Sequence, residues 1–456
     1  MKRAWIIASF TSIMVACGFA QTRKARQELA EPPVAAAGAS SNLAHPSPYN
    51  FPGVQYPRIE ADNRVTFHFN APNAQKVQVS IVNVPFDMEK GSDGVWTYTS
   101  APQPPGYHNY WMIVDGAIVL DPATQAFIGY GHMCNGFEIP EAGVDWYDIK
   151  DVPHGHVTAE NYFGKSINAW RHIYVYTPPG YDANLKTRYP VFYLQHGGGE
   201  DERVWIEMGR TNVILDNLLA QGKVKPMIVV METSATGGSE APGGRPGIGG
   251  APAAGGAGRG PGAAPGAGAA PGAGAAAPGR GFPGIGGPGG GAYGQFMTAD
   301  LIPWIDKNFR TIPDKDHRAM AGLSMGGMQT SAVTMANLDK FSYIGFFSGG
   351  AAAGGPARGR GGAPGTPAPP PAAPAPLDLK TIYNGQMAVP AEFNKKVKVL
   401  FMSCGSMENA AALRAHQQQL AAAGIAGSYV YISPGTAHEW QTWRRSLYAF
   451  APLLFR

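Results

Sequence analysis

The pattern of hydrophobic and polar positions changes twice along this chain of 456 residues. Over residues 51–152, short alternating, β-branched and aromatic runs such as VTFHF and KVQVSIV are separated by turn residues such as NAPNA and EKGSDG. Short strands at this spacing, with no helical pattern between them, are typical of a small β-sandwich. The sequence therefore predicts an all-β domain over this stretch.

From residue 153 onward, continuous apolar runs alternate with helical periodicity. YPVFYLQHGGG and PMIVVMETS are typical of buried strands, whereas TNVILDNLLAQG has the pattern of an amphipathic helix closed by glycine. Buried strands that alternate with helices form a mostly parallel sheet covered on both faces. We expect an α/β domain over residues 153–456.

Three segments show neither the strand pattern nor the helical pattern. Residues 21–50 are polar and rich in Ala and Pro, which favours a linker. Residues 237–292 and 349–376 consist almost wholly of Gly, Ala, Pro and a few Arg, so they can bury little surface to offset chain entropy, and we expect disorder. Each follows the carboxyl end of a predicted strand, where α/β sheets bind ligands, although an expanded loop without a role is the simpler interpretation.

The N-terminus has the organisation of an export signal over residues 1–20. MKR is followed by the apolar run AWIIASFTSIMVA and then by small residues. Cleavage after Ala20 is favoured, whereas an imperfect lipobox before Cys17 would leave a lipid-bearing cysteine. Both interpretations predict a secreted or periplasmic protein, with a membrane as partner only if Cys17 is lipidated.

Composition narrows the classes of partner. The formal net charge is only +4, and no dense Lys/Arg run is interleaved with aromatics, which argues against nucleic-acid binding. Cys134 and Cys404 fall in different predicted domains, so a disulfide between them is not expected. With no CxxC pair and no His/Cys cluster at zinc spacing, we expect neither a metal nor a cofactor. Oligomeric state leaves no signal in the pattern.

One serine stands between glycines where a predicted strand meets a predicted helix, in AGLSMGGM (residues 321–328). Gly-x-Ser-x-Gly at such a junction is the pattern of a nucleophile elbow, a strained turn that exposes the hydroxyl above the sheet. An inert turn would have the same sequence, and a serine hydroxyl is a poor nucleophile without a base, an orienting acid and oxyanion donors. Ser324 is therefore a candidate nucleophile whose partners must be found.

Partners occur in the chain order serine, acid, histidine that hydrolases of this kind use. His438, on the loop after the last predicted strand, is the candidate base, whereas His416 lies in an Ala/Gln-rich helix and is expected to be exposed. Glu408, after the strand VKVLFMSCG, is the candidate acid. Glu439 competes with it, but neighbours in sequence rarely face each other correctly.

A glycine loop, His196-Gly197-Gly198-Gly199, follows the strand VFYLQ and has the HGGG pattern that supplies oxyanion donors. The expected donors are the backbone N–H groups of Gly198 and Met325, with Gly197 as the alternative. Trp440, beside the candidate base, is a candidate wall of an aromatic acyl pocket. Packing roles are expected for several neighbouring or sandwich residues, namely Trp443, Trp205, Arg210, Trp96 and Trp111.

These motifs carry a family resemblance. HGGGEDERVWIEMGRTNVILDNLLAQGKVKPMIVVM, AGLSMGGMQT and HEWQTWRRSLYAFAPLLF resemble the esterase-D-like group of α/β-hydrolases, which includes feruloyl and acetylxylan esterases of carbohydrate esterase family one. The resemblance covers about residues 153–456 apart from the two insertions. The preceding sandwich is similar to the early-set immunoglobulin-like domain often found before such esterases, on cues such as Gly94-Val95-Trp96 and Pro105-Gly106-Tyr107.

The resemblance implies an exported serine carboxylesterase that hydrolyses feruloyl or acetyl esters of plant polysaccharides or oligosaccharides. It assigns the nucleophile to Ser324, the base to His438 and the acid to Glu408, where many members have Gly-x-x-Asp instead of Gly-Ser-Met-Glu. Two alternatives stay open. Enterochelin-type siderophore esterases and acyltransferases share the resemblance, and a non-catalytic protein could bind glycan through the sandwich.

Overall fold

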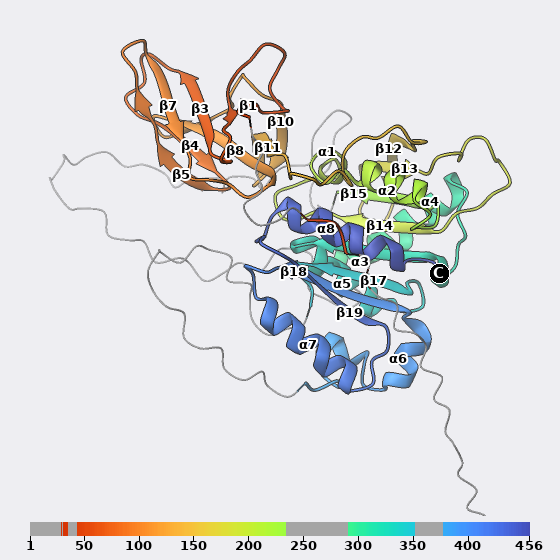
Figure 1. The fold of residues 1–456 in the computed structure, drawn as a ribbon. Coiled ribbons are helices and arrows are strands. Elements are labelled where there is room, and N and C mark those ends of the chain that lie inside the picture. The colour runs from red at the N-terminus through yellow and green to blue at the C-terminus, as the bar shows by residue number, and fades with distance from the viewer. Residues whose placement is uncertain (1–28, 30, 35–42, 234–290, 352–376) are drawn as a thin grey trace, which may run out of the picture.

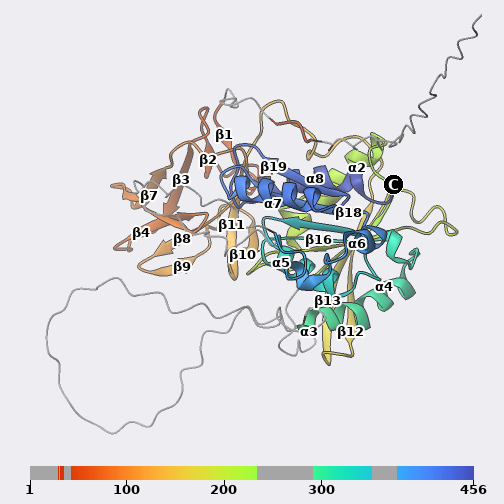
Figure 2. The same cartoon turned by 90° about the horizontal axis from the view of Figure 1, so that it is seen from below.

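The computed structural model describes residues 29, 31–34, 43–233, 291–351 and 377–456. Two parts lie side by side within them, a β-sandwich and an α/β domain (Figures 1 and 2). The predicted signal segment, most of the predicted linker and nearly all of both insertions lie outside the described residues. No helix in the described ranges combines the length and the apolar character needed to cross a bilayer.

Two antiparallel sheets form the sandwich. One has the order β1–β2–β3–β7–β6, with bounds His45–Pro46, Arg58–Ile59, Val65–Asn70, Val95–Thr99 and Glu89–Lys90. The other has the order β10–β11–β8–β4–β5, with bounds Ala126–Gly129, His132–Ile139, Gly106–Val114, Val77–Ile81 and Val84–Asp87, and β9 (Ala117–Val119) pairs with β8. Alternate apolar residues of both sheets, such as Phe67 and Phe137, are fully buried between them, which accounts for the period of two in the sequence.

The sandwich begins earlier than the sequence predicts. β1 lies inside the segment expected to be a linker and pairs with β2, and Tyr49 is buried with its hydroxyl donating to Glu138. A strand of two residues is too short to produce a visible alternation, so composition alone suggested a linker. The linker prediction up to residue 50 is therefore wrong at its C-terminal end.

The α/β domain is built on one sheet of eight strands, which confirms the predicted fold class. Its order is β12–β13–β15–β14–β16–β17–β18–β19, with antiparallel pairing at β12–β13–β15 and parallel pairing in the rest. The bounds are His156–Gly164, Ala169–Thr177, Ile228–Glu232, Val191–Gln195, Arg318–Leu323, Tyr343–Phe347, Val399–Gly405 and Ser428–Ser433. Strands β14 to β18 are fully buried, as their continuous apolar runs predict, whereas β19 at the edge of the sheet is mostly half-buried.

Helices cover both faces of this sheet. One face packs against α1 (Val204–Glu207), α2 (Thr211–Ala220) and α8 (Trp440–Phe450), followed by η5 (Ala451–Leu453). The other face packs against α5 (Met325–Ala336) and, toward the two edges, against α3 (Gly291–Phe296), η2 (Met297–Leu301), α4 (Ile302–Asn308), α6 (Pro390–Lys396) and α7 (Ala410–Ala422). Two short turns of 3₁₀ helix complete the elements, η3 (Lys315–His317) and η4 (Ile382–Gly385).

Two predictions about these elements need correction. His416, expected to be exposed, is buried because it shares one face of α7 with Leu413 and Leu420. Its imidazole forms a hydrogen bond with the hydroxyl of Tyr383 at 3.1 Å. The edges of the insertions are also ordered parts of the fold, since Gly291 begins α3 and Gly349 packs against the turn at Ser324. Small residues there reflect close packing rather than a disordered segment.

Helix α8 joins the α/β domain to the sandwich. Arg444 pairs with Glu138 at 2.5 Å and Arg445 pairs with Glu141 at 2.6 Å, all four side chains being buried. A single apolar cluster also includes side chains of both parts, among them Phe127 of the sandwich and core residues of the α/β domain. The two parts therefore meet through a packed and charge-paired interface.

Candidate active site

Ser324 occupies a strained turn between β16 and α5. Its backbone has φ 51° and ψ −115°, a conformation that non-glycine residues rarely adopt and that is concentrated at functional sites. A Cβ on Gly322 would lie 2.4 Å from the backbone of Gly326, and a Cβ on Gly326 would lie 2.3 Å from the carbonyl oxygen of His196. Both glycines are thus required by close backbone packing around the turn.

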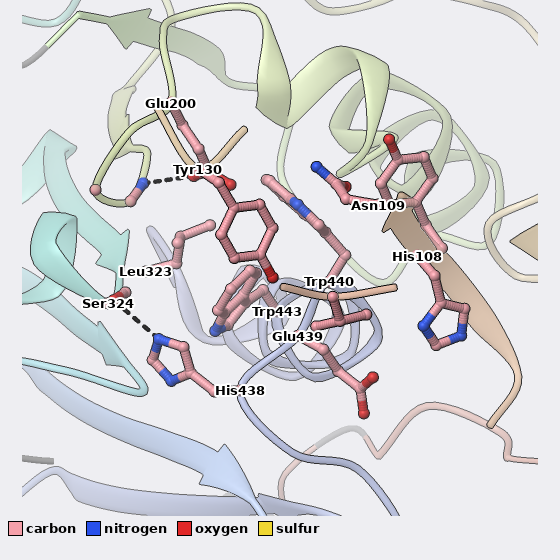
Figure 3. A pocket seen from close by; sticks show the side chains of 14 residues that line it. His108, Asn109, Tyr130, Glu200, Leu323, Ser324, His438, Glu439, Trp440 and Trp443 are labelled. Carbon is pink, nitrogen blue, oxygen red and sulfur yellow. Dashed lines mark hydrogen bonds between the residues drawn. The ribbon is translucent and has the colours of Figure 1, made fainter. Parts of the chain in front are cut away.

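The structure brings the three separated candidate residues together. His438 Nε2 lies 2.9 Å from Ser324 Oγ, and His438 Nδ1 lies 2.8 Å from Glu408 Oε2 (Figure 3 draws the first of these contacts). The competing acid, Glu439, instead accepts a hydrogen bond from the backbone N–H of Ala437 at 2.9 Å. Of the two candidate acids, it is therefore Glu408 that contacts the candidate base.

Glu408 is held in place by further donors. Its Oε1 accepts from the backbone N–H of Gly405 and from the hydroxyl of Ser348, each at 2.7 Å. Burial by itself raises the pKa of this carboxyl, but the hydrogen bonds and charge of His438, with Gly405 and Ser348, more than offset it and leave the pKa below its ordinary value. Glu408 is consequently a carboxylate at neutral pH and can orient and stabilise a protonated imidazole.

The glycines of the loop after β14 differ in their hydrogen bonds. The N–H of Gly197 donates to Glu200 Oε2 at 2.7 Å, and the carbonyl oxygen of Gly199 accepts from the N–H of Gly131 in the sandwich at 2.9 Å. Among the hydrogen bonds of the described residues, the N–H groups of Gly198 and Met325 have no acceptor. Gly198 also adjoins Met325, since a Cβ built on it would lie 3.9 Å from Met325 Sδ. These two N–H groups are therefore free to donate to an oxyanion, whereas the N–H of the alternative, Gly197, is engaged by Glu200.

Two tryptophans lie near His438. Trp440 lines the pocket at Ser324, and so does Trp443, which the sequence suggested for packing alone. The Trp443 ring meets the His438 ring edge-on at 5.2 Å, and its Nε1 donates to Ser348 at 3.2 Å. Trp443 therefore contacts both the base and a residue that holds the acid.

The remaining residues for which the sequence predicts packing roles do not line the pocket at Ser324. Trp205 is buried and donates to the carbonyl oxygen of Gln195, and Arg210 pairs with Glu138 at 3.1 Å, so both act in packing. Trp96 is buried in the sandwich core. Trp111 is also buried, and its ring packs beside that of Tyr130 at 5.4 Å.

Both parts of the chain line the pocket beside Ser324 (Figure 3). The sandwich contributes Val82, Tyr107, His108, Asn109 and Tyr130. No sequence pattern marks these residues as part of the site, because their place in it depends on how the sandwich docks. Glu200 was also missed, although its position directly after the glycine loop could have drawn attention to it. Within the described ranges, no group of three or more His, Cys, Asp or Glu side chains is arranged to hold a metal ion.

Comparisons with known proteins find similarity to esterases. Residues 277–454 match the model of the esterase family, described as "Putative esterase". The chain is 33% identical over 419 residues to an endo-1,4-beta-xylanase/feruloyl esterase of Xylanibacter ruminicola, an alignment that covers 90% of this chain and 47% of the relative. It is 25% identical over 201 residues to endo-1,4-beta-xylanase Y of Acetivibrio thermocellus, covering 42% of this chain and 14% of the relative. The chain thus spans about half or less of these relatives' lengths.

A solved structure has a similar fold. The enterobactin esterase FES of Shigella flexneri, determined in the presence of 2,3-dihydroxy-N-benzoyl-glycine, superposes with a TM-score of 0.51. The match covers 85% of this chain and 92% of that protein at 13% identity, so it bears on fold alone.

Proposed function

We propose that this chain, an esterase-type α/β-hydrolase preceded by a β-sandwich, is a serine carboxylesterase that acts through Ser324, His438 and Glu408. The observation that carries the proposal is the hydrogen-bonded chain from the Ser324 hydroxyl to His438 and on to Glu408, at 2.9 and 2.8 Å. A hydroxyl on a strained turn, with a base and an orienting carboxylate in contact, is the arrangement that activates serine.

The reaction follows from the positions of the donors and acceptors. As Ser324 Oγ bonds to the ester carbonyl carbon, His438 Nε2 accepts its proton, and the oxyanion accepts hydrogen bonds from the N–H groups of Gly198 and Met325. The ester C–O bond then breaks, and His438 returns the proton to the leaving alcohol. Water attacks the acyl-serine in the same way, so that the carboxylic acid leaves and the free hydroxyl is restored.

We further propose that the substrates are feruloyl or acetyl esters of plant polysaccharides or oligosaccharides. The relative in Xylanibacter ruminicola, which is named a xylanase and feruloyl esterase, supports this class. Aromatic side chains around the pocket, including Trp440 and Tyr130, favour an aromatic acyl group. The signal-like N-terminus favours export to the periplasm or medium, where such polymers occur, and release or lipid attachment there depends on processing at Ala20 or Cys17.

Ser324→Ala tests the proposal. Hydrolysis of an activated acetate ester should fall by at least about a thousandfold, because the attacking atom is removed while the oxyanion donors remain. Unchanged turnover in this variant, with the fold intact by circular dichroism, would refute the assignment. Methyl ferulate, acetylated xylan and a catecholate trilactone then separate the polysaccharide-ester activity from the siderophore-ester alternative.

A further inference from the structure

The sandwich reaches the active site through the tips of two hairpins. Val82 and Asn83 join β4 to β5, and Tyr130 and Gly131 join β10 to β11. All four residues have positive φ, with 48° at Val82 and 55° at Tyr130. Two-residue turns of this geometry are type I′, for which Asn, Asp and Gly are preferred because a bulky or β-branched residue is strained there.

A third hairpin tip of the same sandwich provides a comparison. Asp115 and Gly116 join β8 to β9 with φ 48° and 88°, so this turn has the same backbone and the residue pair that the turn prefers. It does not line the pocket beside Ser324, whereas Val82 and Tyr130 do. The unfavourable residues therefore stand where the hairpin tip faces the active site, which indicates that their side chains, rather than the turn, account for their presence.

Direct contact fixes one of these tips to the glycine loop at residues 196–199, called the oxyanion loop below. The N–H of Gly131 donates to the carbonyl oxygen of Gly199 at 2.9 Å. A Cβ on Gly199 would lie only 2.4 Å from the nitrogen of Gly131, so the two backbones approach as closely as glycine permits. Since Gly199 adjoins the expected donor Gly198, the tip at Tyr130 holds a defined position relative to the reacting carbonyl.

The Tyr130 ring projects into the pocket from this anchored tip. Figure 3 shows it between the side that carries Glu200 and the side that carries Trp443. The Trp111 ring packs beside it in a tilted arrangement at 5.4 Å, yet 45% of the residue is exposed, so an aromatic surface remains available to a ligand. Planar aromatic groups pack well against such surfaces.

We propose that Tyr130, with Val82 beside the pocket, is a specificity-determining residue contributed by the sandwich, and that it holds the planar aromatic acyl group of the ester next to Ser324. This inference rests on the proposed esterase function and adds to it the part of the chain that selects the acyl group. An acetyl group is too small to use this surface. Tyr130 consequently affects aromatic esters and leaves acetyl esters almost unaffected.

Tyr130→Gly tests the inference, because glycine removes the ring and suits the turn. The expected result is a loss of about tenfold or more in kcat/KM for methyl ferulate, carried mainly by KM, with turnover of an activated acetate ester within about twofold of the parent protein. The melting temperature should stay the same or rise, since strain at the turn is relieved. Val82→Gly should act in the same direction, and Tyr130→Phe should retain most of the activity toward methyl ferulate.

Asp115→Gly is the control, because it places glycine at the first position of the hairpin tip outside the pocket, where it also removes the hydrogen bonds from the N–H groups of Gln75 and Lys76 to the carboxylate. It should leave the ratio of the two activities unchanged. Equal activity of Tyr130→Gly and the parent protein on both esters would overturn the inference while leaving the esterase function intact, and so would equal losses on both. If the parent protein hydrolysed neither ester, the proposed function itself would fail.

Discussion

Glu200 is a carboxyl group beside the active site that the proposed reaction does not use. Burial and, less strongly, the charge of Asp201 raise the pKa of Glu200 to about 8, although the N–H of Gly197 favours its charged form. Between its ordinary pKa and this value, the folded protein holds a proton that the unfolded chain releases. The unfolding free energy should therefore fall as pH rises through this window.

Glu200→Gln should remove this dependence. Between pH 5.5 and 8.5 the unfolding free energy of the parent protein should decrease relative to that of the variant, by on the order of 1 kcal/mol or more. Urea unfolding of both proteins at the two pH values measures the difference, and Glu89→Gln on the exposed strand β6 is the control. Parallel pH profiles for the parent and Glu200→Gln would show that Glu200 titrates normally.

Single residues differ in how much of their role the sequence reveals. The contact of Ser324 with His438 could be predicted because an elbow pattern and the order of residues after strands indicate it, and that of Glu408 because it lies on the loop after a buried strand. Tyr130 and Val82 could not, since they enter the site only through docking of another domain. The pKa of Glu200 likewise depends on burial, which no local pattern specifies.

At the scale of elements, the turn from β16 to α5 depends on how closely three backbone segments pack. The Cβ of an alanine at position 326 would meet the carbonyl oxygen of His196, whereas one at Gly198 would have no heavy atom nearer than 3.9 Å. Two glycines of the same site thus differ in what they tolerate, although both belong to glycine-rich motifs in the sequence.

Gly326→Ala should consequently lower stability by roughly 2 kcal/mol or more and abolish ester turnover, because overpacking must displace the elbow or the oxyanion loop. Gly198→Ala should stay within about 1 kcal/mol of the parent protein in unfolding free energy. Thermal or urea unfolding of the two variants provides the measurement. Similar stabilities for both would mean that the elbow has more room than the structure gives it.

Element boundaries were harder to predict than element types. The strands and helices around Ser324 follow the apolar pattern closely, because each is long and buried. β1 and the buried face of α7 escaped prediction, since two residues are too few to show alternation and the small residues around His416 conceal an apolar face. Local composition therefore misled where tertiary contacts decide burial.

At the scale of the whole molecule, the sandwich and the α/β domain form one packed unit around the active site. Burial alone raises the pKa of Glu138, but Arg444 and Arg210 more than offset it, so the pKa lies below its ordinary value. The stabilisation from this pair is present above the ordinary pKa of a glutamate and is lost as pH falls through the lower folded-state value. The interface should accordingly weaken in acid.

Glu138→Gln should destabilise the protein by about 3–5 kcal/mol at neutral pH, because it leaves the buried Arg444 without its countercharge. The loss relative to the parent should shrink as pH falls, since acid also neutralises Glu138. Urea unfolding measures both effects. Glu392→Gln, which breaks an exposed pair with Lys395, should change stability little. A neutral effect of Glu138→Gln would contradict the role given to this interface.

The central claim, that Ser324 is an activated nucleophile, is tested most directly by the site of fluorophosphonate labelling in the folded protein, located by peptide mass spectrometry. We expect one phosphonyl group, on the peptide that contains Ser324, with no labelling of Ser324→Ala and strongly slowed labelling of His438→Ala. A folded parent protein that resists the probe, or one labelled at another residue while Ser324 stays free, would contradict it.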